Sequence, residues 1–217
     1  MATEAQILIV DMGSQYTRVI ERVLRDHQYR SAVLSPDKAS GWMAQHGAKA
    51  VIISGGDKSV YDEDAPQVPQ NILDADVPIL GICYGMQWLA KHFGGTVERV
   101  QDQTGYGDTQ IELGGCDLFL DIEKDSPLNV WASHGDSVTK LPEGALVTST
   151  STEGGGIKSM VIPEHKVWAV QFHPEVKQTE DGEQMLLNFV DGICHCTEDW
   201  SETNMVKDIR DACNDPQ

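Results

Sequence analysis

Short apolar runs alternate with segments of helical spacing in the first half of the chain. The runs are QILIVD (residues 6–11), SAVLS (31–35), KAVIISGG (49–56) and VPILGIC (77–83). Between the first two, residues 14–28 place apolar side chains three and four positions apart, which predicts an amphipathic helix. Nearly continuous apolar strands are typical of a parallel sheet that is buried on both faces. The pattern predicts an α/β fold, with an open, mostly parallel sheet flanked by helices.

The second half has a different pattern. Short β-type runs broken by Gly, Pro and Asp occupy residues 109–115, 128–133, 145–151, 158–163 and 166–172. We expect them to form a small antiparallel β region appended to the α/β core. Residues 182–194 then predict a closing helix, whose apolar face comprises Met185, Leu186, Phe189, Val190 and Ile193. We expect one domain over residues 1–196. Residues 197–217 are acidic with a narrow apolar face, and predict a linker or tail.

Charge and cysteine content exclude several kinds of protein. The chain has 217 residues and a formal net charge of −18. Such a surface would repel nucleic acids and anionic membranes, so we expect neither as a partner. No apolar stretch is long enough to span a bilayer, and no signal peptide is visible. Five scattered cysteines with no metal-ligand spacing predict a reducing cytoplasm, no disulfide framework and no metal site.

The end of the fourth apolar run carries the first candidate chemistry. Cys83 lies between Gly81 and Gly85 in GICYG, directly before a helix-like segment. A strand, a Gly-x-Cys-x-Gly turn and a helix form the geometry of a nucleophile elbow. The helix N-terminus would favour the thiolate, and the Tyr84 amide would point at an oxyanion. A small buried structural cysteine is the competing interpretation.

A thiol nucleophile needs a base, and two of the seven histidines stand in unusual settings. His173 ends an apolar strand in FHPEV, where Glu175 could fix its tautomer. The other is His134, which lies in the SHGD turn of residues 133–136. That turn could supply binding contacts or could be an ordinary polar turn. A histidine at a strand end is often merely structural, but Cys83 and Glu175 favour catalysis here.

GICYGMQ and FHPEV, about 90 residues apart, together resemble the class I (triad) glutamine amidotransferases. The resemblance implies that Cys83 attacks the carboxamide of L-glutamine, that His173 transfers protons and that Glu175 orients His173. It implies an oxyanion hole made by Gly56 and Tyr84. The implied glutamine-binding residues are Gln87, Ser133, His134, Gly135 and Asp136.

GSQYT, CYGMQ and SHGD resemble one branch of this family in particular. In that branch ammonia passes to an ATP-pyrophosphatase (synthetase) domain or subunit, which uses ATP and Mg²⁺ to aminate xanthosine monophosphate (XMP). The resemblance implies no cofactor in the present domain, and residues 197–217 would lead to the synthetase. Met12, SGGDKSV and KQTEDG depart from the usual pattern without touching Cys83, His173 or Glu175. Three alternatives remain open: a glutaminase for another acceptor, a catalytically silent regulatory module and a γ-glutamyl peptidase.

Overall fold

The computed structural model describes residues 5–99, 105–123 and 126–201, and its centre is a nine-stranded sheet. Five parallel strands form one side in the order β2-β1-β3-β4-β11. They are β1 (Ile7–Val10), β2 (Ser31–Leu34), β3 (Ala50–Ile53), β4 (Ile79–Ile82) and β11 (Val167–Val170). The strand order is that of flavodoxin-like proteins, in which ligands bind beyond the carboxyl ends of the strands. The predicted α/β fold class is confirmed.

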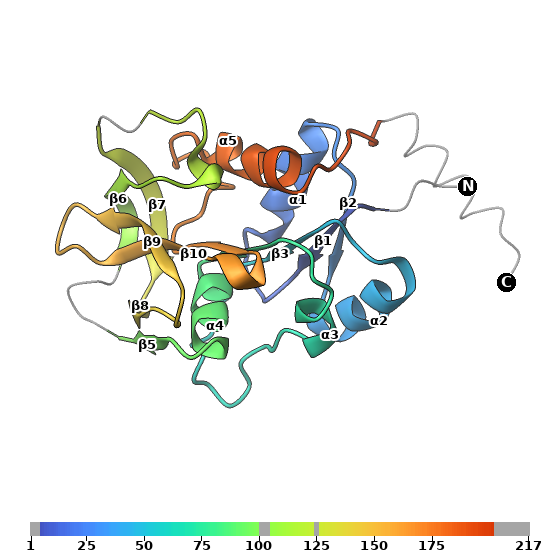
Figure 1. Ribbon diagram of the computed structural model, residues 1–217, viewed down its shortest axis with the longest axis horizontal. Helices are drawn as coiled ribbons and strands as arrows, with labels where there is room; N and C mark the ends of the chain where they lie inside the picture. Colours follow the sequence, from blue (N-terminus) through green and yellow to red (C-terminus); the bar gives the residue numbers. More distant parts are fainter. Residues whose placement is uncertain (1–4, 100–104, 124–125, 202–217) are drawn as a thin grey trace, which may run out of the picture.

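Helices cover both faces of the parallel strands (Figure 1). On one face lie α1 (Thr17–Asp26), α5 (Gly182–Leu187) and the π-helical turn η4 (Asn188–Ile193). On the other face lie α2 (Pro36–His46), α3 (Gln70–Leu73) and α4 (Tyr84–His92). The strands alternate between the two apolar clusters, because Ile7 and Ile9 belong to the first and Leu8 and Val10 to the second.

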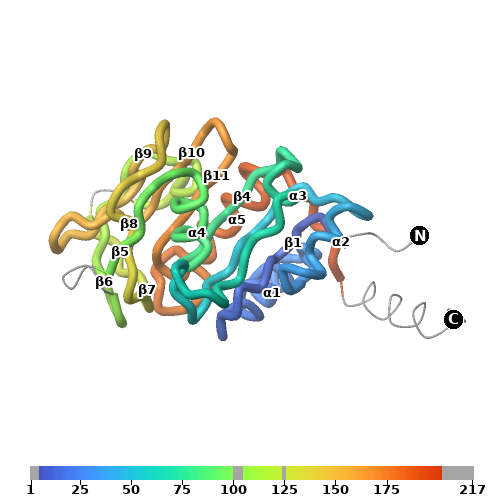
Figure 2. The backbone as a smooth tube through the Cα atoms, turned by 90° about the horizontal axis from the view of Figure 1, so that it is seen from below, coloured from blue at the N-terminus to red at the C-terminus, as the bar shows by residue number. Residues whose placement is uncertain are grey.

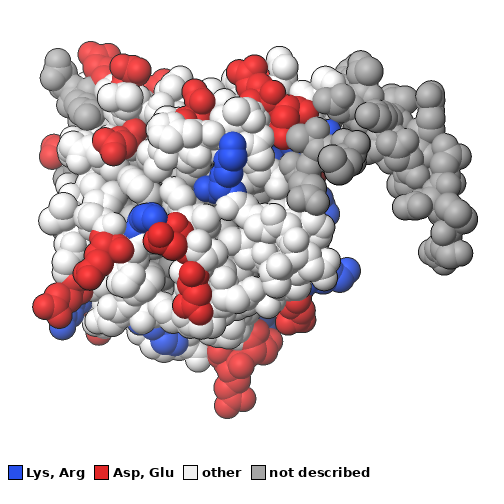
Figure 3. Space-filling view, turned by 45° about the vertical axis from the view of Figure 1, so that its right-hand side comes forward, with Lys and Arg blue, Asp and Glu red and all other residues white. Residues whose placement is uncertain are grey.

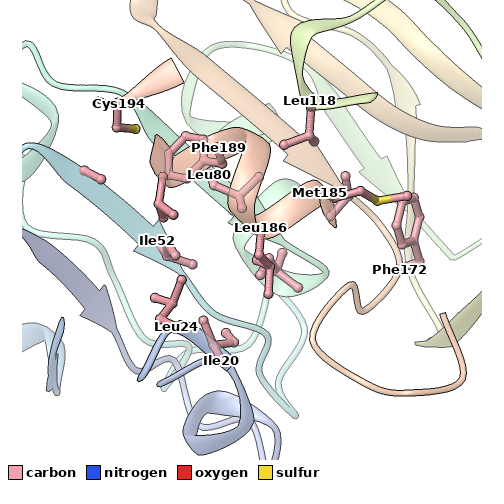
Figure 4. Close-up of a cluster of buried hydrophobic side chains, with 14 of the residues drawn as sticks. Ile20, Leu24, Ile52, Leu80, Leu118, Phe172, Met185, Leu186, Phe189 and Cys194 are labelled. Atoms are coloured by element: carbon pink, nitrogen blue, oxygen red, sulfur yellow. The ribbon is translucent and has the colours of Figure 1, made fainter. Parts of the chain in front are cut away.

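Figure 4 shows the first of these clusters, where side chains from opposite ends of the sequence meet. Ile20 and Leu24 of α1 and Leu186 of α5 are fully buried, as are Ile52 and Leu80 beneath them. The predicted apolar face of the closing helix is therefore in the core, although Ile193 is only partly buried. Burial of one such side chain contributes roughly 1.5–3 kcal/mol, so this cluster ties the end of the domain to its beginning.

The antiparallel strands extend the same sheet and do not form a separate region (Figure 2). Beyond β11 come β10 (Ile157–Ile162), β9 (Leu146–Ser151), β6 (Gly105–Leu113) and β7 (Leu128–His134). Single helical turns, η2 (Asp117–Phe119) and η3 (Pro163–His165), connect some of them. A small second sheet pairs β5 (Thr96–Glu98) with β8 (Ser137–Lys140). Residues 166–172 do contribute to a hairpin, since β11 pairs antiparallel with β10, but β11 also pairs in parallel with β4 and so belongs to the core sheet as well.

The surface and the chain end complete the picture. Acidic side chains are spread over the face drawn in Figure 3 and do not form one stripe, as expected of a solvated acidic surface. Within the described ranges, no helix has the length and apolar character required to cross a bilayer. Cys83, Cys116, Cys194 and Cys196 are free thiols. The predicted tail begins against the core, since the Thr197 amide donates to Gln6 Oε1; residues 202–217 lie outside the described ranges.

Candidate active site

Cys83 stands at a strained turn between β4 and α4. Its φ of +52° and ψ of −103° are unusual for a residue with a side chain. A Cβ added at Gly85 would lie 2.4 Å from the Ile53 carbonyl oxygen, and one at Gly81 would lie 2.6 Å from a Leu89 methyl carbon. Only glycines can hold strand and helix this close. The amide of Cys83 donates to the Val170 carbonyl at 2.8 Å, so β11 also holds the turn.

His173 and Glu175 follow β11 and are held in place by β7 and by Thr179. Glu175 Oε1 lies 2.8 Å from His173 Nδ1, and both side chains are almost completely buried. The His173 amide donates to the Trp131 carbonyl at 2.9 Å, and Thr179 Oγ1 donates to the His173 carbonyl at 2.6 Å. The His173 ring packs edge-on against Tyr16. The carboxylate thus orients a ring whose backbone is already fixed.

The electrostatics of this pair favour a protonated imidazole. Burial by itself lowers the pKa of His173, but hydrogen bonding to Cys83 and to Glu175, with their negative charges, raises that pKa to about 10. Because a carboxylate can only accept, His173 Nδ1 carries a hydrogen and Nε2 is left for the thiol. The contact that Cys83 Sγ itself makes is long, 3.7 Å to the Ser133 carbonyl oxygen. The second carboxylate oxygen of Glu175 has no hydrogen-bond partner among the described residues.

The SHGD turn faces the thiol and is held by a hydrogen-bond network. The Asp136 carbonyl accepts from Gln87 Nε2 at 2.7 Å and from His134 Nδ1 at 3.0 Å. Ser59 Oγ donates to the Asp136 carboxylate at 2.6 Å. Gln87 and His134 are each only 4% exposed, so their polar atoms bind mainly within the protein. Direct contact of either side chain with glutamine stays a prediction.

The two residues predicted for the oxyanion hole lie together at the elbow. A Cβ at Gly56 would be 3.2 Å from the Tyr84 ring and 2.7 Å from the Met12 carbonyl oxygen. Tyr84 is the first residue of α4, where an amide has no acceptor within the helix. Its hydroxyl donates to the Pro66 carbonyl at 2.7 Å, and burial, aided by Asp62, raises its pKa to about 12. The backbone at this point is therefore firmly placed.

One cavity of about 730 Å³ unites the predicted site residues. Nine of the ten predicted site residues line this cavity: Gly56, Cys83, Tyr84, Gln87, Ser133, His134, Gly135, Asp136 and His173. The tenth, Glu175, lies behind His173 and contacts its ring. The volume is in the range of small-molecule sites. Tyr16, Ser59 and Arg99 also line the cavity and were not predicted. Tyr16 lies in GSQYT and Ser59 in SGGDKSV, two motifs noted from the sequence without either residue being assigned to the site, whereas Arg99 lies in none of the noted motifs.

Gln171 and Lys158 are two further residues that sequence reasoning missed. Gln171 is fully buried, and its Nε2 lies 3.8 Å from Cys83 Sγ. Lys158 is 4% exposed, and its Nζ lies 3.2 Å from His134 Nε2. A signal did exist, since both are polar residues inside apolar strand patterns.

Comparison with known proteins identifies the family. Residues 8–193 match the family described as glutamine amidotransferase class-I. This match covers most of the chain, so the protein belongs to the class I glutamine amidotransferases, as its sequence predicts.

Within that family the chain is similar to glutamine-hydrolysing GMP synthases. It is 45% identical over 202 residues to the enzyme of Rhodopseudomonas palustris, covering 92% of this chain and 37% of the relative. Over 215 residues it is 41% identical to the enzyme of Petrotoga mobilis, covering 97% of this chain and 41% of the relative. The chain therefore spans about two fifths of the length of these curated relatives.

Solved structures agree on the fold. A candidate GMP synthase subunit from Thermoplasma acidophilum has a TM-score of 0.75 and 26% identity, covering 96% of this chain and 98% of that one. A glutamine amidotransferase from Thermotoga maritima has a TM-score of 0.65 at 22% identity, covering 99% of this chain and 87% of that one. The second likeness is one of fold alone.

Proposed function

We propose that the chain hydrolyses the side-chain amide of L-glutamine through a γ-glutamyl thioester on Cys83, and that its ammonia is used to aminate XMP to GMP. The observation that carries the first part is the strained Cys83 elbow facing a buried His173–Glu175 pair. A positioned thiol, a base and an orienting carboxylate are the parts that nucleophilic acyl transfer needs.

The chemistry follows from the placement of these groups. His173 takes the thiol proton, and the Cys83 sulfur attacks the carboxamide carbon. The oxyanion is then stabilised by the amides of Tyr84 and Gly56, each such donor being worth about 3 kcal/mol. His173 then gives the proton to the leaving nitrogen, ammonia departs, and the γ-glutamyl thioester on Cys83 remains. His173 then takes a proton from a water molecule as the water oxygen attacks the thioester carbon. The carbon–sulfur bond breaks, glutamate is released, and His173 returns the proton to the Cys83 sulfur. General acid–base catalysis of this kind contributes roughly 10²–10⁴ in rate.

The SHGD turn and α4 are proposed to hold the amino-acid end of glutamine. Ser133, Gly135 and Asp136 line the cavity beside Cys83, together with Gln87 and His134. Since Gln87 and His134 both donate to the Asp136 carbonyl, their part is to fix the shape of the turn that meets the substrate.

The acceptor is the second part of the proposal. Glutamine-hydrolysing GMP synthases are longer than this chain, which supports a partner ATP-pyrophosphatase domain that uses ATP and Mg²⁺. We assign residues 1–196 to the amidotransferase domain and 197–217 to the connection with that partner. The domain itself is proposed to need no cofactor, and the place of action to be the cytoplasm.

The test is glutamate release from glutamine by the purified chain, alone and with the ATP-pyrophosphatase domain of a GMP synthetase, ATP and XMP. We expect release that rises with the partner and is lost in Cys83→Ala. Release that ignores the partner would overturn the GMP assignment in favour of a glutaminase for another acceptor. Absence of release in both settings would overturn the proposal in favour of a silent regulatory module.

A further inference from the structure

Gln171 is a fully buried carboxamide within the apolar stretch of residues 167–172. It directly follows β11, which lies beside β4 with Val170 opposite Ile82 (Figure 2). Cys83 directly follows β4, so the strand register sets Gln171 against the nucleophile. A carboxamide removed from water costs free energy unless its polar atoms are hydrogen-bonded. The partners that the Gln171 side chain finds therefore indicate what it does.

A chain of hydrogen bonds from the SHGD turn fixes the orientation of this carboxamide. The Asp136 carbonyl can only accept, so Gln87 presents its NH₂ group to that oxygen at 2.7 Å. The second hydrogen of the same group is directed to Gln171 Oε1, which lies 3.4 Å from Gln87 Nε2. Because the side-chain oxygen of Gln171 faces Gln87, its NH₂ group faces Cys83, with Nε2 3.8 Å from Sγ.

The sulfur of Cys83 thus has one acceptor and one donor beside it. In the thiol, the S–H group can donate to the Ser133 carbonyl oxygen, 3.7 Å away. Once His173 has taken the proton, that contact has no hydrogen left, whereas the side-chain N–H of Gln171 still points at the sulfur. A hydrogen bond to an anion is roughly twice as strong as one between neutral groups. The Gln171 contact therefore strengthens when the thiolate forms, and again when the sulfur leaves the thioester carbon.

We propose that Gln171 is a further catalytic residue of glutamine cleavage: its side-chain amide, oriented by Gln87, donates to the Cys83 sulfur and stabilises the thiolate. This inference rests on the proposed function, because it takes Cys83 as the nucleophile. Gln171 is not among the described residues that line the cavity, so it acts on the sulfur without contacting glutamine. The same chain of hydrogen bonds joins the turn that meets the substrate to the nucleophile.

The contact itself is tested by heteronuclear NMR of the full chain, on the side-chain N–H protons of Gln171. Cys83→Ala removes the sulfur, so the resonance of the proton that faces it should move upfield as its hydrogen bond is lost. Cys194→Ala is the matched control, since it removes another buried free thiol from the same apolar cluster. Gln171 resonances that stay in place in Cys83→Ala, or that move equally in Cys194→Ala, would overturn the inference.

Steady-state kinetics test the catalytic role. Gln171→Met keeps the length of the buried side chain and removes its donor. We expect kcat for glutamate release, with the ATP-pyrophosphatase domain, ATP and XMP present, to fall roughly ten-fold, as the loss of one hydrogen bond to an anion predicts. The KM for glutamine should change by less than about two-fold, because Gln171 does not contact the substrate. A merely structural residue would act through Gln87 and the turn, so a raised KM with an unchanged kcat would overturn the inference.

Ser159→Ala is the matched control for these kinetics. It removes a fully buried hydroxyl of β10 and its hydrogen bonds to Thr148 and Ser149, opposite Val170, without touching the sulfur. We expect an unchanged kcat in this variant, and a loss equal to that of Gln171→Met would contradict a specific role for the carboxamide. Circular dichroism checks that both variants are folded. Failure of the proposed function looks different, because the unaltered chain would then release no glutamate with or without its partner.

Discussion

His134 makes a quantitative prediction about stability in acid. The imidazole is 4% exposed, and burial with the charge of Lys158 holds its pKa at about 3, whereas an unfolded histidine titrates near 6.5. Between these values the unfolded chain binds a proton that the folded chain does not, so stability falls as the pH falls. The slope is about 1.4 kcal/mol per pH unit. Between pH 7.5 and pH 5, the titration of His134 alone should therefore lower the free energy of unfolding by about 2 kcal/mol.

Urea unfolding at pH 7.5 and pH 5.0 measures this term. His134→Asn removes the titration and keeps a side chain that can donate to the Asp136 carbonyl. Other groups titrate in both proteins, so the difference between the two pH-dependent losses isolates His134. We expect the variant to lose about 2 kcal/mol less than the unaltered chain on going to pH 5. Equal losses in the two proteins would refute a buried neutral histidine at this position.

Three further substitutions test the geometry of the site. Gly85→Ala forces a Cβ to within 2.4 Å of the Ile53 carbonyl oxygen. Urea unfolding should therefore show that the free energy of unfolding falls by about 3 kcal/mol or more. An unchanged urea midpoint would contradict the close approach of α4 to Ile53. Thr179→Val removes the 2.6 Å bond to the His173 carbonyl, and should cost about 1 kcal/mol of stability together with a lower kcat for glutamine hydrolysis. Glu175→Gln removes a charge that raises the pKa of His173, so the alkaline limb of the pH–rate profile should move to lower pH. The value of kcat should fall less than in His173→Ala. An alkaline limb that does not move would contradict the coupling between Glu175 and His173.

Local patterns made the parallel half of the fold and the Cys83 elbow predictable. Each strand of β1 to β4 is one apolar run, and the elbow is encoded within five consecutive residues. The place of β11 was not predictable in this way, because a parallel pairing with a strand some 90 residues away has no signal in its own composition.

The site residues likewise fall into those that local sequence motifs predict and those that only the folded structure reveals. Cys83, His173 and Glu175 lie in two motifs whose chemistry is readable from adjacent residues. Lys158 and Gln171 act through positions that only strand register brings together, and their side chains interrupt apolar runs without indicating a direction. The bond between Ser59 and the SHGD turn joins two loops, so no periodicity could predict it.

Covalent labelling by a diazoketone analogue of glutamine tests the central claim most directly. Such an analogue loses N₂ and alkylates a nucleophile that recognises it as glutamine. Burial raises the pKa of Cys194, and that of Cys196 to about 11, so both stay protonated at pH 7.5 and serve as internal controls. We predict one adduct per chain, located on Cys83 by peptide mapping, slowed by excess glutamine and absent from Cys83→Ala. An adduct on another cysteine, or one that persists in Cys83→Ala, would contradict the account.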